Sequence, residues 1–461
     1  MITQLARLRR LSALDLRDLT AFLSRFVSLG AGPVVAMAVG TFFSPQVQGY
    51  YFSFASLLGA QTLFESGVGL VVIQMAAHEV VFLKVGLDGS IEGDEQAKRR
   101  LASIFHFGLR WFSVLAGIMV FGVGVAGWLT LQGHSNTITW QIPWLLLVLA
   151  SGLDFLLQPF LNLLEGCGKI IQVYRYRTFS VMTKSAVLIA SAYGGLNLYS
   201  SALSLFAATL VGILYLSGNT RLFLTLLGTP RDSQIRWRQD ILPFQWRIAI
   251  SWMAGFFTTA LFTPIVLAQE GAVAAGQMGM TVALLNGVTM VAFSLMQARI
   301  PEMGGLVAAG AWDALERLFS RQALFSIGLF VLGMATLNGA AWVSHALGMQ
   351  IAHRILDPVP LLVLEGGFLA SFLVGLEATY LRCQKREPFF GLSVVTGSLI
   401  LLSSLLLGHR FGPTGIAGGY LAVYLLVALP AGTVITLRDR RRTRASRPNT
   451  NAGPDNALGL T

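Results

Sequence analysis

The chain has 461 residues, of which 54% are hydrophobic and 12% are charged. A typical soluble domain has about 25% charged residues, so this composition excludes an ordinary soluble protein. Apolar runs longer than about 18 residues alternate with short charged clusters, which indicates a polytopic membrane protein built from helices. The net charge of +11 does not indicate nucleic-acid binding, because the basic residues lie at every second end of the apolar runs.

Residues 1–20 carry leucines at helical spacing, which predicts an amphipathic helix on the membrane surface. The predicted fold is all-α, with about twelve membrane-spanning helices of roughly 20 residues, enough for a hydrocarbon core of about 30 Å. We expect a first six-helix lobe at 21–222, a linker at 223–245, a second six-helix lobe at 246–437 and a basic, disordered tail at 438–461. The predicted spans are Ala21–Phe43, Tyr50–Ala76, Phe105–Leu131, Trp140–Leu164, Phe179–Leu196, Tyr199–Leu222, Trp246–Ala268, Gln277–Gln297, Leu324–Leu347, Val359–Leu381, Phe389–Leu407 and Gly415–Leu437.

The loops between the predicted spans alternate in charge. The N-terminus, every second loop and the tail, counted with their flanking helix ends, contain all of the 33 Lys and Arg residues except Arg354 and Arg410. Basic loops stay on the cytoplasmic side of a membrane, so both termini are expected to be cytoplasmic. Two of these loops are long. The loop 77–104 is predicted to be a solvated connector, and the loop 298–323 is predicted to contain a helix along the membrane surface.

The sequence shows signs of an internal duplication. Pro33 and Pro264 lie in the first and seventh spans, which begin the two halves. A Gln-Gly pair at 48–49 precedes the second span, and a Gly-Gln pair at 276–277 precedes the eighth. An even number of helices in each half gives a parallel repeat. Transporters with such repeats alternate access by rocking one half against the other around a central site.

Short motifs give no indication of an enzyme. The run 122–127 matches GxGxxG, but it lies inside the third span and follows no strand, so its glycines are expected to permit close helix packing. The sequence contains no HExxH or GxSxG motif, and its six histidines are scattered. Cys167 and Cys383 have no metal-ligand spacing, so we expect neither a metal nor a cofactor.

Ionisable residues within the apolar runs are the main functional candidates. A charge inside the membrane costs at least about 2.5 kcal/mol, so such residues usually face protein or water. Glu65 and Asp154 lie near mid-membrane, where we expect a functional role or a buried ion pair. Arg25 and Arg247 lie in the first turns of the first span of each half, and Lys184 lies inside the fifth span. The alternative for these three cations is a side chain that reaches the membrane surface.

Two further carboxylates lie on the tenth predicted span. The spacing of Glu365 and Glu377 offsets them by about 120° around a helix, so they cannot both point into one cavity. Glu377 is expected at the cytoplasmic end of the helix, near Arg382. Glu365 remains the candidate for a role inside the membrane.

Two stretches of the sequence are similar to a known family. The run SPQVQGYYFSFASLLGAQTLFESGVG at 44–69 and the run GPTGIAGGY at 412–420 resemble bacterial polysaccharide exporters. Their superfamily also contains multidrug extruders and oligosaccharide-lipid flippases. The resemblance is local at the two ends, but the plan of twelve spans agrees over nearly the whole chain. It implies two six-helix lobes in a V shape, with a cavity formed by the first, second, seventh and eighth helices.

The same resemblance implies a function. Such a flippase moves an undecaprenyl-diphosphate-linked saccharide from the inner to the outer leaflet of the bacterial inner membrane, for the biosynthesis of a surface polysaccharide such as O-antigen lipopolysaccharide or exopolysaccharide. Its expected partners are membrane lipids, this lipid-linked saccharide, a polysaccharide polymerase and glycosyltransferases. Relatives that flip peptidoglycan precursor usually have about fourteen helices, so the predicted twelve argue against that branch.

The chemistry of such a substrate suggests the site. Arginine pairs with two oxygens of a diphosphate through its planar guanidinium group, so Arg25 and Arg247 are expected to receive the diphosphate at the cytoplasmic mouth. Neutral polar side chains would contact sugar hydroxyls, and carboxylates would couple the movement to protons. The predicted substrate-binding residues are Arg25, Arg247, Gln61, Gln74, Gln158, Asn162 and Lys184, and the predicted ion-coupling residues are Glu65, Asp154 and Glu365.

Two alternative functions remain open from the sequence. A multidrug or cation antiporter on the same scaffold, coupled to protons or sodium, is favoured by the intramembrane carboxylates and disfavoured by the arginines at the mouth. A net positive cavity would support the flippase, and a net negative cavity would support the antiporter. The other alternative is a membrane scaffold for glycan-synthesis enzymes that transports nothing.

Overall fold

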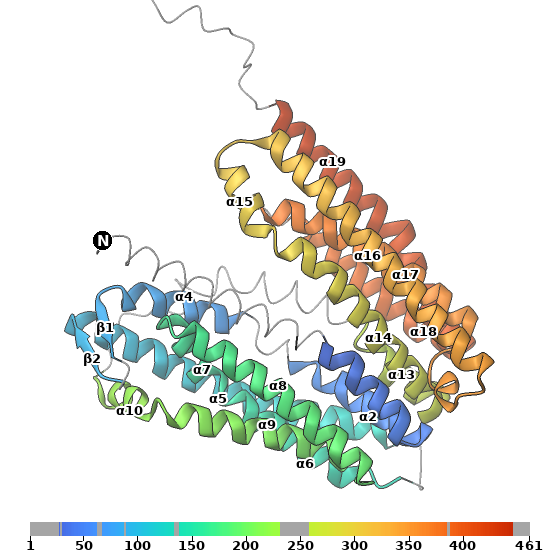
Figure 1. Cartoon of the computed structure of the whole chain (residues 1–461), viewed down its shortest axis with the longest axis horizontal. Coiled ribbons are helices and arrows are strands. Elements are labelled where there is room, and N and C mark those ends of the chain that lie inside the picture. The colour runs from blue at the N-terminus through green and yellow to red at the C-terminus, as the bar shows by residue number, and fades with distance from the viewer. Residues whose placement is uncertain are drawn as a thin grey trace, which may run out of the picture.

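Nearly all of the regular structure is helical, and the helices form two lobes. The computed structural model describes residues 27, 30–61, 67–86, 89–132, 138–230, 258–384 and 388–445. The lobes meet at one end and diverge toward the other, which gives the molecule a V shape (Figure 1). The predicted fold class is therefore confirmed. The predicted surface helix at 1–20 lies outside the described residues.

Each lobe is a bundle of long apolar helices. The first lobe contains a helix at Gly30–Phe42, α2 (Pro45–Leu58), α4 (Val68–Val80), the antiparallel strands β1 (Leu83–Val85) and β2 (Ile91–Gly93), α5 (Glu95–Leu131), α6 (Gln141–Phe155), α7 (Gln158–Gly166), α8 (Ile170–Tyr193), α9 (Tyr199–Ser217) and α10 (Thr220–Gly228). The second contains α13 (Phe262–Glu270), α14 (Ala272–Gln297), α15 (Ile300–Ala308), α16 (Trp312–Ala346), η1 (Gln350–Arg354), α17 (Pro358–Arg382), α18 (Phe390–Val423), the π-helix η2 (Tyr424–Ala428) and α19 (Leu429–Ala445). Seven described helices, some of them continuing through a kink, are long and apolar enough to cross a membrane.

The second and fourth predicted spans are each divided into two helices. Helix α2 ends at Leu58 and α4 begins at Val68, and Gly67, just before α4, has a φ of 75°, which favours glycine. Leu156 and Leu157 separate α6 from α7, and Pro159 follows in the first turn of α7, where its missing N–H costs no helical hydrogen bond. Hydropathy alone predicts one continuous helix in each case, because the apolar run is not interrupted.

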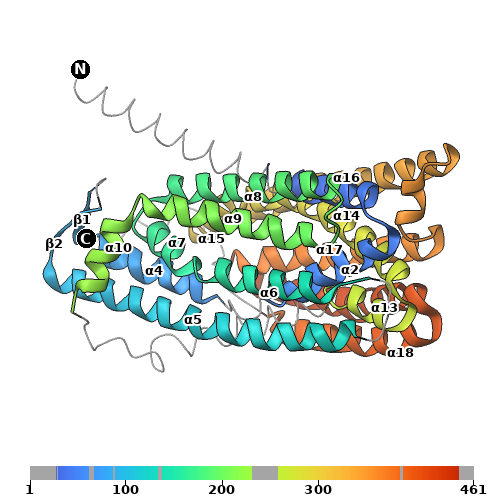
Figure 2. The ribbon, with the colours of Figure 1, turned by 90° about the horizontal axis from the view of Figure 1, so that it is seen from below.

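The loop predicted at 77–104 as a solvated connector is structured instead. Strands β1 and β2 form a hairpin, and α5 begins directly after Asp94, whose carboxylate accepts a hydrogen bond from the Ala97 N–H at 3.0 Å. Leu101 is buried in an apolar cluster with Phe223 of α10, and the hairpin and α10 lie together at one end of the first lobe (Figure 2). The charged residues of this loop occupy only the outer faces of its elements. The start of the predicted linker is likewise helical, because α10 continues to Gly228.

The surface helix predicted at 298–323 is also different. Helix α15 ends at Ala308, the chain turns at Gly310 with a φ of 68°, and α16 then begins at Trp312. The amphipathic stretch is therefore the first part of a spanning helix. Its apolar face packs into the second lobe, since Phe319 is buried against the Tyr380 ring at a centroid distance of 4.8 Å.

The beginning of the tail predicted to be disordered is helical. Helix α19 continues to Ala445. The guanidinium group of Arg440 lies 4.6 Å from the centre of the Tyr380 ring and 5.5 Å from that of Phe319. Such cation–π contacts contribute about 0.5–1 kcal/mol at exposed sites and more where water is excluded. They give part of the basic segment a packed position, which its composition alone does not predict.

The predicted eleventh and twelfth spans form a tight antiparallel pair. Within α18, Gly412 has a non-helical φ of 58° and is followed by a proline. Ser403 lies against Gly419 and Leu407 against Gly415, so the two segments run in opposite directions. The Gly-Pro pair marks the turn in the sequence because glycine adopts positive φ and proline cannot continue a helix.

The glycines of the run 122–127 serve helix packing, as predicted. Trp144 of α6 is fully buried and donates through its indole N–H to the Gly124 carbonyl oxygen at 3.0 Å. A side chain at Gly127 would overlap the Trp144 ring, whereas one at Gly122 would meet no atom within 4 Å. Only part of the motif is therefore constrained.

We expect Gly127→Ala to destabilise the first lobe. The added methyl group displaces Trp144, and overpacking of this kind costs about 1–3 kcal/mol. The thermal unfolding midpoint of the purified protein should fall. Gly122→Ala is the matched control on the same helix and should leave the midpoint unchanged. Equal midpoints for the two variants would contradict the packing at Trp144.

Candidate functional site

The lobes are joined where they meet by a buried polar contact, the interlobe seal, formed by Phe43, Gln48, Gly276 and Arg354. The Gln48 side-chain amide donates to the carbonyl oxygens of Gly276 at 2.9 Å and of Arg354 at 3.0 Å. The Arg354 guanidinium group donates to the Phe43 carbonyl oxygen at 2.7 Å. Gln48 is 1% exposed and Arg354 is 9% exposed, so these bonds form away from water, where each is stronger.

Glycines allow the backbones at the interlobe seal to approach closely. A side chain at Gly49 of α2 would overlap the Ala272 carbonyl oxygen of α14, and one at Gly279 would overlap Phe52. The two pairs that suggest duplication, at 48–49 and 276–277, therefore meet across the lobe interface. The predicted equivalence of these pairs has a structural counterpart: α2 and α14 are the helices through which the lobes touch most extensively.

The two broken helices of the first lobe lie side by side. Helices α4 and α7 pack against each other, and the Ser151 hydroxyl of α6 donates to the Gln61 amide oxygen at 3.2 Å, just after the end of α2. This bond links α6 to the residues that follow α2. Broken helices expose backbone polar groups inside a membrane, and transporters use them to bind substrates and coupling ions.

Asp154 lies next to the break between α6 and α7. Its carboxylate interacts electrostatically with the Lys184 ammonium group of α8 and lies near the Thr209 side chain of α9, whose hydroxyl donates to the Leu205 carbonyl oxygen at 2.9 Å. Lys184, which is exposed, is therefore the cation that interacts with the half-buried Asp154 from another helix. The sequence placed both residues among the candidates but gave no means of pairing them.

Removal of one member of this pair should be more harmful than removal of both. We expect Lys184→Met to lower the thermal unfolding midpoint, because it leaves Asp154 without its cation. Loss of one partner of a buried pair costs about 3–5 kcal/mol, and the partial exposure of Lys184 puts the expected cost below that range. Adding Asp154→Asn should restore much of the midpoint. A double variant less stable than Lys184→Met would contradict the pairing.

The other predicted substrate-binding residues are distributed along the first lobe. Gln158 begins α7 at the break and is half-buried, and Gln74 is exposed on α4. Asn162 is 3% exposed, and its side-chain nitrogen has no hydrogen-bond partner among the described residues. The structure thus brings Gln61, Asp154 and Lys184 to the level of the breaks. Arg25, Arg247 and Glu65 lie outside the described residues, so their roles stay predictions.

The two carboxylates of α17 are separate from this cluster. Both oxygens of Glu365 accept hydrogen bonds at 2.8 Å from the Asn338 amide of α16. Glu377 accepts a hydrogen bond from the Thr433 hydroxyl at 2.8 Å and is attracted to Arg440. The predicted ion-coupling residues Asp154 and Glu365 therefore belong to different lobes, and each interacts with residues of its own lobe.

Arg354 and Asn338 are the residues that the sequence alone did not single out. Arg354 is one of two arginines on the side of the membrane with few basic residues, and that rarity was its only signal. Its burial depends on contact between two lobes that are far apart in sequence. Asn338 has no signal, because an amide inside an apolar run is unremarkable until a carboxylate is found beside it.

Comparison with known proteins identifies the fold. No protein-family model matches the chain, and no curated protein matches it in sequence. An inward-facing multidrug resistance MATE family transporter of the MOP superfamily aligns over 93% of this chain and 98% of its own, with 11% identity and a TM-score of 0.64. An outward-facing transporter of that description aligns over 94% and 97%, with 11% identity and a TM-score of 0.56. The lipid II flippase MurJ, inward closed, aligns over 92% and 87%, with 10% identity and a TM-score of 0.59.

These similarities define the class of protein. The chain has the fold that these MATE and MurJ structures share and is a multi-pass membrane protein. This is the two-lobe fold that the sequence suggested. The similarity includes both multidrug transporters and a lipid flippase, so the fold alone does not select the substrate.

Proposed function

We propose that the protein is a flippase that moves a lipid-linked saccharide from the inner to the outer leaflet by alternating access. The observation that carries this proposal is the state of the carboxylates within the spanning helices. Asp154, Glu365 and Glu377 each interact with an amide, hydroxyl or basic partner in their own lobe. Two of these three carboxylates, Asp154 and Glu377, interact with a basic side chain of their own lobe and are therefore not held ready for a cationic substrate. A saccharide diphosphate instead needs cations and neutral polar groups.

The charge distribution supports a particular orientation of the protein in the membrane. The described loops at the diverging end contain clusters of Lys and Arg, whereas the sealed end has only Arg354 and Arg410 among the described residues. Basic loops remain in the cytoplasm, so the diverging end faces the cytoplasm. The higher TM-score to the inward-facing than to the outward-facing MATE structure agrees with this orientation. In this state the protein would receive its substrate from the inner leaflet.

The first lobe offers polar groups along the proposed path. Lys184 is exposed on α8 at a depth where contact with lipid would cost at least about 2.5 kcal/mol, so this face belongs toward the space between the lobes. Gln61, Gln158 and Asn162 would then contact sugar hydroxyls near the helix breaks, and Gln74 would do so nearer the mouth. Protonation of Asp154 would free Lys184 to pair with the diphosphate, which couples substrate binding to a proton.

Arg25 and Arg247 are proposed to receive the diphosphate at the mouth, one from each lobe. We expect Arg25→Ala and Arg247→Ala each to reduce surface polysaccharide more than about tenfold, because loss of a charge-assisted contact costs about 1.5–3 kcal/mol. Arg410→Ala, which changes an arginine at the opposite end, is the control. Unchanged surface polysaccharide at normal protein levels would contradict the assignment of the two arginines.

The second candidate is a cation antiporter, and Glu365 favours it. Asn338, which donates to this carboxylate, is neutral, so Glu365 has a charge available for a proton or a cation. If the protein is an antiporter, cells that carry the Glu365→Gln variant should lose resistance to a cationic dye. If it is a flippase, this substitution should leave the dye sensitivity of the cells unchanged.

A further inference from the structure

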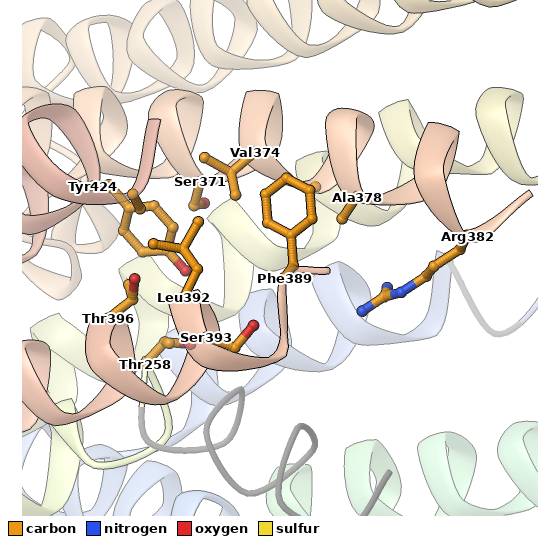
Figure 3. A pocket seen from close by; sticks show the side chains of 12 residues that line it. Thr258, Ser371, Val374, Ala378, Arg382, Phe389, Leu392, Ser393, Thr396 and Tyr424 are labelled. Atoms are coloured by element: carbon orange, nitrogen blue, oxygen red, sulfur yellow. The ribbon is translucent and has the colours of Figure 1, made fainter. Parts of the chain in front are cut away.

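The second lobe contains a cavity that the proposed function has not used. Its volume is about 320 Å³, at the lower end of the range for ligand sites. It lies between α17, the start of α18 and the π-helix η2 (Figure 3). Short π-helical segments often occur at functional sites. The cavity is therefore a candidate binding site separate from the cluster in the first lobe.

Hydroxyl groups line most of the polar surface of this cavity. They come from Thr258, Ser371, Ser393, Thr396 and Tyr424, and none of the lining residues is acidic. Ser371 donates to the Phe368 carbonyl oxygen at 2.9 Å, and Tyr424 is paired with Thr258. A cavity with these groups and without a carboxylate is poorly suited to a cation.

The hydroxyl group of Thr396 is available to a polar ligand in this cavity. The side chain of Thr396 is 4% exposed, and its hydroxyl oxygen has no hydrogen-bond partner among the described residues. A buried polar group without a partner costs about 1–3 kcal/mol, so such groups usually have a bonded ligand or water. In Figure 3 the Thr396 side chain lies at the deep end of the cavity, beside Tyr424.

The cavity is elongated along α17. Its wall follows the helix from Ser371 to Arg382, about 16 Å at 1.5 Å per residue. Arg382, the last residue of α17, lies at the other end of the cavity from Thr396 and Tyr424, with Phe389 between them (Figure 3). A cation thus marks the shallow end and hydroxyl groups mark the deep end. Aromatic and aliphatic side chains separate them, so the space is too long and too apolar for an inorganic anion alone.

We propose that this cavity is a second-lobe subsite for the glycosyl phosphate head of the lipid-linked substrate. The saccharide would contact Phe389 through its apolar face and bond to the hydroxyl groups of Ser393 and Thr396. The phosphate would lie near Arg382. This inference rests on the proposed flippase function and assigns part of the substrate to the second lobe.

Protection of an introduced cysteine from chemical labelling tests this subsite. Ser393→Cys is placed in a full-length protein in which Cys167 and Cys383 are replaced by Ala, and a methanethiosulfonate reagent is applied in nanodiscs. The probe is the lipid-linked saccharide fraction from the organism's own membranes, used intact or after mild acid has removed the saccharide. We expect the intact fraction at ten times its Kd to slow labelling about tenfold, because occupied sites are not labelled. Acid-treated lipid, released saccharide and inorganic phosphate should each protect less.

Thr396→Val provides the decisive variant, since it removes the hydroxyl group and keeps the shape. We expect it to weaken protection about tenfold, as loss of a buried hydrogen bond does. Ser404→Ala is the control, because Ser404 on the same helix is also buried without a partner but does not line the cavity. Equal protection by intact and acid-treated lipid, or full protection in Thr396→Val, would overturn the subsite. If either result is found while export is normal, the subsite is wrong but the proposed flippase function is unaffected.

Discussion

Arg354→Gln is expected to release the outer end of the protein and shift it toward the state in which that end is open. Arg354 is 9% exposed and donates to the Phe43 carbonyl oxygen at 2.7 Å, and its own carbonyl oxygen accepts from Gln48. A hydrogen bond from a charged group contributes about 1.5–3 kcal/mol. The bond is expected to be absent when the lobes separate at this end. Its loss then destabilises only the sealed state and changes the ratio of the sealed to the open state about 10- to 100-fold.

The accessibility of Met280 reports this change. Met280 is 2% exposed, and its sulfur contacts the Gln48 amide at 3.5 Å inside the interlobe seal. Met280→Cys in the cysteine-free protein should react slowly with a water-soluble maleimide, and adding Arg354→Gln should increase the rate at least about tenfold. Arg410→Gln is the matched control, because that arginine lies outside the seal. Equal rates with and without Arg354→Gln would show that the seal does not depend on this arginine.

Gly49→Val is expected to prevent the interlobe seal from closing at all. Any side chain at this position overlaps the Ala272 carbonyl oxygen, and both atoms belong to helix backbones that cannot yield locally. The cost of overpacking, about 1–3 kcal/mol or more, falls only on the closed arrangement of the outer end. The variant should therefore insert normally, show a fast-reacting Met280→Cys, and export less than about a tenth of the normal amount of substrate.

Gly32→Val is the control for this prediction. Gly32 lies on the helix Gly30–Phe42 of the same lobe, and an added side chain there would meet no atom within 4 Å. In the Gly32→Val variant, Met280→Cys should react with the maleimide as slowly as in the parent protein, and export should be normal. Normal export by Gly49→Val would mean that the close approach of α2 and α14 is not part of the transport cycle.

The sequence predicted the parts of the fold that depend on one helix at a time. Apolar length and basic loops gave the spans, and Gly412 with its proline marked the last turn between them. The helix breaks were not predicted, because Gly67 and Pro159 occur within apolar runs that hydropathy averages over. The helical structure of loop residues such as Leu101 was not predicted, because charged residues outnumber the apolar ones around them.

The site was less accessible to prediction because it depends on contacts between distant segments. Asp154 and Lys184 were recognised as unusual charges, but only the packing of α6 and α8 against α9 brings them together. Arg354 was counted as a loop residue, and its burial requires the first lobe. Glu65 remains a prediction, so its role as a proton-coupling residue or as an ion-pair partner rests on the sequence.

The most direct test of the flippase function is the location of the lipid-linked saccharide in cells that lack this protein but retain the synthesis enzymes. We predict that the undecaprenyl-diphosphate-linked saccharide accumulates on the inner leaflet and that surface polysaccharide is lost. The parent protein should restore its movement to the outer leaflet, and Gly49→Val should not. A saccharide that is no longer made would indicate a scaffold for its synthesis. A saccharide that still reaches the outer leaflet at the normal rate would contradict the flippase function.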